Sequence, residues 1–288
     1  MKKIVAGIIL SSMLMMALAG CGNKDGFDTE KAVNAITREE GSGTRGAFTE
    51  LFDLEEKLDD GTKRDLISKD IGVENNTNTI LTTVADDTYA IGYISMGSLN
   101  DSVKAVQIDG VDANAGNVKS GEYKISRPFA IATKSDPSEV AQDFIGFILS
   151  KEGEEVVADS YIAVSDGAAP YAGDKPSGTI TVGGSSSVSP LMEKLIERYK
   201  EINPNANIEL QISDSSIGMT QTIEGAYDIG MASRALKDSE KEELEDTQIA
   251  LDGIAVIVNL GNEATSLSED EVKQIYLGEV ETWSDILK

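Results

Sequence analysis

The feature that most constrains the fold is a recurring unit, in which a strand runs into a hydroxyl-rich turn and then a helix. One copy spans residues 37–48, Thr-Arg-Glu-Glu-Gly-Ser-Gly-Thr-Arg-Gly-Ala-Phe. After strands at 179–182 and 208–212, the turns read Gly-Gly-Ser-Ser-Ser-Val-Ser-Pro and Ser-Asp-Ser-Ser-Ile-Gly. A further strand at 228–234 ends in Ala-Ser-Arg. This alternation predicts α/β layers with a mainly parallel sheet in each domain.

The turns are rich in hydrogen-bond donors. In the first, Ser42 and Thr44 carry hydroxyls, and Gly41 and Gly43 are predicted to adopt backbone conformations closed to other residues. The following helix offers N–H groups at the positive end of its dipole, and Arg38 adds a planar fork suited to an oxyanion. Converging turns of this kind predict an anion site at helix N-termini. The alternative is a set of ordinary serine caps in an α/β protein.

Composition narrows the class of protein. A chain of 288 residues is long enough for two domains. The excess of 50 Asp and Glu over 25 Lys and Arg argues against nucleic acid or an anionic membrane surface as partner. A small anion remains possible, because local donors in a cleft can outweigh a screened surface field. The sequence has no histidine, no G-x-S-x-G or Walker motif, and no S-x-x-K at the serine turns. These absences predict a binding protein, without metal or cofactor, rather than an enzyme.

The N-terminus predicts the compartment. Residues 1–20 form a signal peptide, with a basic start and an apolar run too short for a comfortable membrane span. The run ends in Leu-Ala-Gly-Cys, which resembles the lipobox of bacterial lipoproteins, and Cys21 is the single cysteine. The resemblance implies lipidation of Cys21 and anchoring on the outer face of the cell membrane. An ordinary signal peptide with an incidental cysteine is the alternative. Residues 21–26 then form a short polar tether.

The rest of the chain divides at a turn-rich linker, residues 171–178. Apolar periodicity predicts helices at 45–58, 138–160 and 267–276. It also predicts strands at 103–108, 127–133 and 249–259, an alternating stretch at 89–95, and a capped tail at 278–287.

Several motifs together resemble the phosphate-binding proteins of bacterial phosphate ABC transporters. They are the turns at 183–190 and 213–218, the strand end at 228–234, the segment Arg-Glu-Glu-Gly-Ser-Gly-Thr-Arg at 38–45, and the tail Ile-Tyr-Leu-Gly-Glu-Val-Glu-Thr-Trp-Ser-Asp at 275–285. The resemblance implies a two-lobed type II periplasmic-binding-protein fold. It also implies that inorganic phosphate is held between the lobes and delivered to an ABC permease.

The order of the motifs differs from the family's. In the family the Gly-Ser-Ser-Ser-Val turn comes first, and Thr-Trp-Ser-Asp leads directly into the arginine and Gly-Ser-Gly-Thr. Here Thr-Trp-Ser-Asp ends the chain and Gly-Ser-Gly-Thr opens it. The order indicates a circular permutation in which residues 171–178 join the ancestral ends; a mis-assembled reading frame is the alternative. The permuted order predicts one lobe from 126–261 and another from 27–125 plus 262–288, with crossovers at 127–133 and 249–259.

The resemblance also implies the site residues. The predicted phosphate-binding residues are Arg38, Ser42, Gly43, Thr44, Ser187, Val188, Ser215 and Ser233, with Glu40 orienting the guanidinium of Arg38. One departure matters: Ser233 stands where the family has an aspartate that accepts the proton of hydrogen phosphate and repels sulfate. Asp214 is a possible substitute acceptor, or equally a turn residue that caps the next helix.

Other functions remain open at this point. The protein could bind another oxyanion, such as sulfate or molybdate. It could also be an anion-sensing or adhesion lipoprotein without a role in transport.

Overall fold

The computed structural model describes residues 26–58, 63–165 and 167–287. The predicted signal peptide and Cys21 lie outside the described residues. Among the helices of the described part, none has the length and apolar character needed to cross a membrane.

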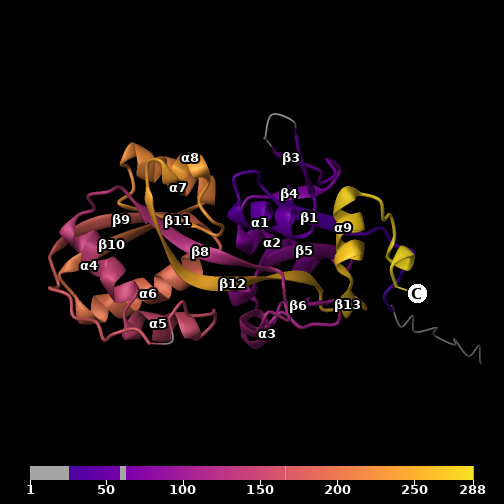
Figure 1. The fold of residues 1–288 in the computed structure, drawn as a ribbon. Coiled ribbons are helices and arrows are strands. Elements are labelled where there is room, and N and C mark those ends of the chain that lie inside the picture. The colour runs from indigo at the N-terminus through magenta and orange to yellow at the C-terminus, as the bar shows by residue number, and fades with distance from the viewer. Residues whose placement is uncertain (1–25, 59–62, 166, 288) are drawn as a thin grey trace, which may run out of the picture.

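One sheet of nine strands runs through the whole molecule in the order β10-β9-β11-β8-β12-β5-β1-β4, with β6 also paired to β12 (Figure 1). The strands are β1 (Asn34–Arg38), β4 (Gly72–Glu74), β5 (Ala90–Ser95), β6 (Val103–Ala105), β8 (Ser126–Thr133), β9 (Gly178–Ser185), β10 (Ala206–Ser213), β11 (Ile229–Ala232) and β12 (Glu245–Asn259). The expectation of a mainly parallel sheet in each domain therefore holds for the outer strands, but the two halves belong to one continuous sheet. The outer strands of each half are parallel, but β8 and β12 run antiparallel to each other and join the halves.

Helices cover the sheet. They are α1 (Gly43–Leu51), α2 (Thr77–Asp86), α3 (Ala115–Ser120), α4 (Glu139–Ile148), α5 (Lys151–Ala158), α6 (Ser189–Ile202), α7 (Ser215–Glu224), α8 (Asp238–Lys241) and α9 (Glu269–Leu277). Short 3-10 turns η1 (Met96–Ser98) and η2 (Trp283–Asp285) and small strand pairs, β2 (Glu55–Lys57) with β3 (Lys63–Asp65) and β7 (Gln107–Ile108) with β13 (Ser266–Leu267), complete the fold.

Each of two lobes has one large hydrophobic core and a smaller hydrophobic cluster. The first lobe contains α1, β5, α9 and Trp283 around one core, and the second contains α4, α6 and β9 around another. Strand β12 belongs to both: residues 245–253 pair with β8, whereas Ile254–Val258 pair with β5 and pack in the first lobe. The packing therefore changes lobes at residues 253–254, not at the predicted boundary of 261. We call residues 27–125 and 254–287 the first lobe, and residues 126–253 the second lobe.

Several local expectations differ from the structure for identifiable reasons. The helix expected to reach residue 58 ends at Leu51, and the chain reverses at Asp53, whose φ of 54° is incompatible with a continuing helix. The stretch at 89–95 was expected to alternate, but all six residues of β5 are buried because the strand lies inside the sheet, between β12 and β1. The helical stretch at 138–160 is two helices, α4 and α5, because Ser150 caps a new helix.

The beginning and the end of the described chain lie together in the first lobe (Figure 1). Ala32 and Thr282 form an antiparallel bridge. The backbone N–H of Trp283 donates to the Lys31 carbonyl at 3.1 Å, and the backbone N–H of Ser284 donates to the Thr29 carbonyl at 2.7 Å. The C-terminal tail is thus fixed to the start of the folded protein by backbone hydrogen bonds.

Candidate functional site

The predicted turns converge between the lobes. The first lobe contributes Arg38 at the end of β1 and Thr44 in the first turn of α1. The second contributes the turn after β9, the start of α7 and the end of β11, which place Ser187, Ser215 and Ser233. All five residues are buried, with 0–2% of the surface of each exposed. Residues far apart in the sequence therefore form one buried polar cluster.

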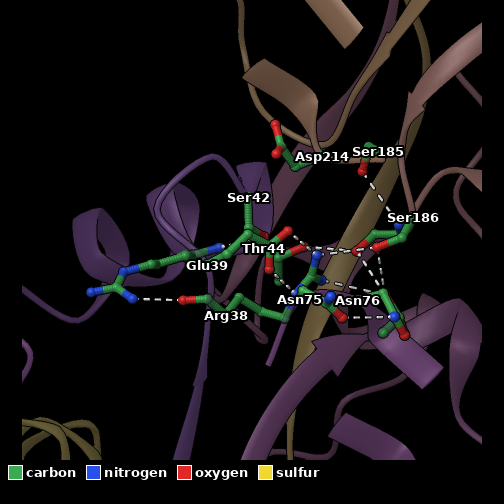
Figure 2. A network of polar contacts seen from close by, with 12 residues as sticks. Arg38, Glu39, Ser42, Thr44, Asn75, Asn76, Ser185, Ser186 and Asp214 are labelled. Atoms are coloured by element: carbon green, nitrogen blue, oxygen red, sulfur yellow. Dashed lines mark hydrogen bonds and ion pairs between the residues drawn. The ribbon is translucent and has the colours of Figure 1, made fainter. Parts of the chain in front are cut away.

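Hydroxyl groups link the two lobes directly. The hydroxyls of Thr44 and Ser187 lie 2.8 Å apart across the cleft, and that of Ser185 donates to Ser233 at 3.0 Å. Ser233 is also within 3.5 Å of the hydroxyls of both Thr44 and Ser215. These contacts show a closed cleft in which the hydroxyls form a continuous network (Figure 2).

Arg38 is the cation of this network. Its Nε and Nη2 each donate to the Glu39 carboxylate at 2.8 Å, and Nη2 also donates to the Ser186 hydroxyl at 3.1 Å (Figure 2). The prediction that Glu40 orients the guanidinium is therefore wrong, because Glu39 makes the two-point contact and Glu40 is exposed. Both glutamates follow the end of β1 at Arg38, and Glu40 already lies in the turn, so the alternation of a strand does not decide which carboxylate meets the guanidinium.

Neither Gly41 nor Gly43 has a positive φ, so the prediction that they adopt backbone conformations closed to other residues is wrong. Both glycines instead allow neighbouring atoms to come close to the backbone. A Cβ on Gly43 would lie 2.4 Å from the Ser215 Oγ, and one on Gly41 would lie 2.6 Å from the carboxylate of Asp214. The Ser216 N–H also donates to the Gly41 carbonyl at 3.2 Å. The first-lobe turn can approach α7 this closely because both positions lack side chains.

Three other predicted residues have local structural roles. Ser42 caps α1 by accepting from the Arg45 N–H, and Asp214 caps α7 by accepting from the Ile217 N–H at 2.8 Å. The capping alternative for Asp214 is thus observed, and Figure 2 shows this side chain apart from the dashed network. The Val188 N–H donates to the Ser185 carbonyl at 3.0 Å within the turn, and its side chain packs in the core.

Sequence reasoning missed three hydroxyls of the cluster. Thr77, the first residue of α2, lies within 3.3 Å of Ser187 and 3.4 Å of Ser186. Ser185 and Ser186 stand in the same serine run as Ser187, and that run was the available signal for both. For Thr77, the signal was the Asn-Asn-Thr segment between a short strand and a helix, which is a typical N-cap pattern.

The chemistry of the cluster suits a small oxyanion. Hydroxyls, the guanidinium of Arg38 and the N-termini of α1 and α7 meet in one place, and all of them can donate. Among the described residues, no carboxylate contacts the clustered hydroxyls, and no group of His, Cys, Asp and Glu side chains could hold a metal ion. The site as described can therefore bind an anion by hydrogen bonds and charge.

Comparison with known proteins identifies the family. A family model described as a PBP superfamily domain matches residues 21–152 and 169–288. The phosphate-binding protein PstS 2 of Streptococcus agalactiae is 48% identical over 273 residues, which cover 94% of this chain and 93% of that protein. The chain belongs to this family of phosphate-binding proteins.

A solved structure supports the same assignment. The phosphate-binding protein of a phosphate ABC transporter from Streptococcus pneumoniae is 45% identical, with a TM-score of 0.70 over 88% of this chain and 99% of that chain. The predicted two-lobed periplasmic-binding-protein fold is thereby confirmed. A third relative, the phosphate-binding protein PstS of Staphylococcus haemolyticus, is 41% identical over 111 residues only, or 36% of this chain and 35% of that protein.

Proposed function

We propose that this protein captures inorganic phosphate between its two lobes and delivers it to the permease of an ABC transporter. The observation that carries the proposal is the buried cluster of hydroxyls around Arg38, assembled from both lobes in a member of a phosphate-binding family. The protein acts by binding and releasing the anion, without catalysing a reaction. The permease then receives phosphate when the lobes separate.

Closure provides the binding energy. Each hydrogen bond from the site to a charged guest contributes about 1.5–3 kcal/mol, which offsets the cost of removing the anion from water. Arg38, Ser42, Gly43 and Thr44 meet the anion from the first lobe. Ser187, Ser215 and Ser233 meet it from the second lobe through their hydroxyls. Val188 meets it through its backbone N–H, which donates to the Ser185 carbonyl in this structure and must turn to the anion on binding.

Selectivity needs an acceptor for the proton of hydrogen phosphate, and we assign this role to Asp214. Its carboxylate lies against Gly41, next in sequence to Ser42, and it precedes Ser215. Oδ1 accepts the capping bond from Ile217, and within the described residues Oδ2 makes no hydrogen bond. Glu39 is less suited, because both of its oxygens already accept from Arg38.

We further propose that Cys21 is lipidated after signal-peptide cleavage, which holds the protein on the outer face of the cell membrane. The support is the Leu-Ala-Gly-Cys sequence and the absence of any other cysteine. Cys21→Ser should release the protein into the medium and abolish incorporation of labelled palmitate. Retention of both properties in the variant would contradict the anchor.

The permuted order of the chain is supported by two observations. The tail at Trp283 and Ser284 is hydrogen-bonded to residues 29–31, so the two segments that a permutation would have separated lie side by side. The Staphylococcus haemolyticus relative matches about a third of the chain, as expected when a collinear comparison can follow only one segment of a rearranged protein. Joining residue 288 to residue 27 and opening the chain within 171–178 should give a protein that folds and binds phosphate. Failure of this variant to fold would argue against the permutation.

Calorimetric titration of the mature protein with phosphate, sulfate and molybdate tests the function. Phosphate should bind more tightly than the other two anions. Tighter binding of sulfate or molybdate would favour the alternative of a different oxyanion. Loss of phosphate uptake on deletion of the gene would separate a transport protein from an anion sensor.

A further inference from the structure

We propose that Thr77 is a direct ligand of the bound anion and that the N-terminus of α2 is a further helix end at the site. The inference rests on the proposed function and extends it to an element outside the recognised motifs. Thr77 is the first residue of the ten-residue helix α2, and its exposed fraction is 3%. It belongs to the first lobe but contacts the serine turn of the second.

The contacts of Thr77 place it in the network around Arg38. Arg38 uses Nε and Nη2 for Glu39, so Nη1 is its remaining terminal nitrogen, and this nitrogen lies 3.5 Å from the Thr77 hydroxyl. The same hydroxyl lies 3.3 Å from that of Ser187. An anion held by Arg38 and Ser187 therefore places an oxygen within reach of Thr77.

The direction of the hydrogen bonds makes Thr77 a donor to the guest. Arg38 can only donate, so the Thr77 oxygen accepts from Nη1, and the Thr77 proton can be donated to Ser186, to Ser187 or to a guest held between them. A hydroxyl polarised by a guanidinium and facing a buried anion makes a charge-assisted bond.

The start of α2 leaves this hydroxyl free for a guest. Asn76 is the capping residue and accepts from the Thr79 N–H at 2.9 Å, so the Thr77 side chain has no capping duty. The N–H groups of Thr77 and Asn78 lie in the first turn of α2, where they lack partners within the helix.

Titration of three variants with phosphate tests the inference. Thr77→Val keeps the shape and removes the hydroxyl, Thr77→Ser keeps the hydroxyl, and Thr82→Val makes the same change at an exposed position of α2, where the hydroxyl bonds to the Asn78 carbonyl. We expect Thr77→Val to weaken phosphate binding by about tenfold to a hundredfold, as for one lost bond to a charged group. Thr77→Ser should restore most of the affinity, and Thr82→Val should leave it unchanged.

The outcomes separate a ligand from a structural residue. Unchanged affinity in Thr77→Val would overturn the inference. The inference would also be overturned if Thr77→Val weakened phosphate binding and lowered the melting temperature measured without phosphate, and if Thr77→Ser failed to restore phosphate binding. If the unmodified protein binds sulfate or molybdate instead of phosphate, the proposed function fails, and the same variants titrated with that anion still test Thr77.

Discussion

Two buried polar clusters join the lobes, and they differ in how their charges are balanced. In the anion site, Arg38 pairs with Glu39, whose side chain is 20% exposed, while the surrounding groups are hydroxyls. Near the crossover strands, Arg127 and Asp252 form a hinge pair with side chains 2% and 0% exposed. The carboxylate of the first cluster is partly exposed, whereas that of the second is fully buried and accepts from only part of the Arg127 guanidinium, since Nε and Nη1 of Arg127 are buried without a hydrogen-bond partner among the described residues.

The hinge pair belongs to the second lobe and is hydrogen-bonded to Ser95 of the first lobe. The Arg127 Nη2 donates to Asp252 Oδ2 at 3.1 Å, and Asp252 Oδ1 accepts from the Ser95 hydroxyl at 2.9 Å. Asp252 pairs with Arg127 on β8 at the point where β12 leaves the second lobe. Burial outweighs the pairing, and it raises the pKa of Asp252 to about 6 and lowers the pKa of Arg127 to about 10.

The contrast indicates what each cluster is for. A buried carboxylate with several donors stabilises one arrangement of the lobes without a guest, provided that its partner stays in place. A cluster of hydroxyls around a cation lacks a buried negative charge, and an oxyanion supplies it. We therefore expect changes at the hinge pair to affect folding and changes in the anion site to affect binding.

The largest effect is expected at the hinge. Arg127→Met leaves Asp252 buried without its partner and should lower the free energy of unfolding by about 3–5 kcal/mol. Denaturant unfolding without phosphate measures the loss. The control is Arg198→Met, which breaks an exposed pair with Glu201 and should cost about 0–1 kcal/mol. Equal costs in the two variants would contradict the distinction between the clusters.

The loss in Arg127→Met should depend on pH. Arg127 lowers the pKa of Asp252, so its removal moves the folded-state pKa further above about 6, while the unfolded value stays near 3.8. A raised folded-state pKa contributes stability at low pH that is lost as pH rises through it. The variant should therefore fall further below the unmodified protein as pH rises from about 6. If the difference in unfolding free energy between the two proteins became smaller as pH rises from about 6, this assignment of the Asp252 pKa would be wrong.

The next largest effect is expected at Arg38. Removing one partner of a desolvated charge pair costs about 2–5 kcal/mol, so Arg38→Ala should weaken phosphate binding by that amount. Arg45→Ala should cost less, because Arg45 donates to Asp65 and to the Arg38 carbonyl rather than to the hydroxyls. Calorimetry on both variants provides the comparison, and equal losses would mean that the role of Arg38 has been misassigned.

The sequence was sufficient for the parts of the site that reside in short motifs. Arg38, Thr44, Ser187, Ser215 and Ser233 all lie in the buried cluster, because each lies at the end of a strand or in the turn or helix start that follows it. Thr77 was missed since β4 is a short edge strand with exposed residues and carries no buried pattern. A hydroxyl-rich turn therefore predicts a residue of the cluster only when the strand before it can be recognised from its buried apolar residues.

The choices that depend on long-range pairing could not be made from the sequence. Whether Glu39 or Glu40 faces Arg38 depends on how the chain leaves β1, which pairs with β4 and β5. The continuity of the sheet depends on β8 and β12, which pair in antiparallel fashion across a long stretch of intervening chain. No local periodicity encodes that register, so the sequence predicts mainly parallel sheets and two crossover strands but not that these two strands pair into one continuous sheet.

A smaller effect is expected from blocking closure without touching a donor. In Gly41→Ala the added methyl would meet the Asp214 carboxylate at 2.6 Å, so the lobes could not close fully without a shift. Overpacking of this kind costs about 1–3 kcal/mol, which should appear as weaker phosphate binding with normal unfolding. Gly46→Ala on α1 is the control, since nothing lies within 4 Å of its Cβ position. If both glycine variants bind phosphate as the unmodified protein does, the close approach at Gly41 is not needed for closure.

The smallest effect is expected from Asp214→Asn, and it addresses selectivity. Asparagine caps a helix about as well as aspartate, so the substitution keeps the bond to the Ile217 N–H and removes only the negative charge. A dianion without a proton is repelled by that charge, whereas hydrogen phosphate can donate to it. Sulfate affinity should therefore rise and phosphate affinity should fall in the variant, by titration at the same pH. Because Ser233 lies among hydroxyls, a neutral residue at Asp214 would leave only groups that can hydrogen-bond to either anion. An unmodified protein that strongly prefers phosphate, together with an Asp214→Asn variant that keeps this preference, would mean that the acceptor is a different group.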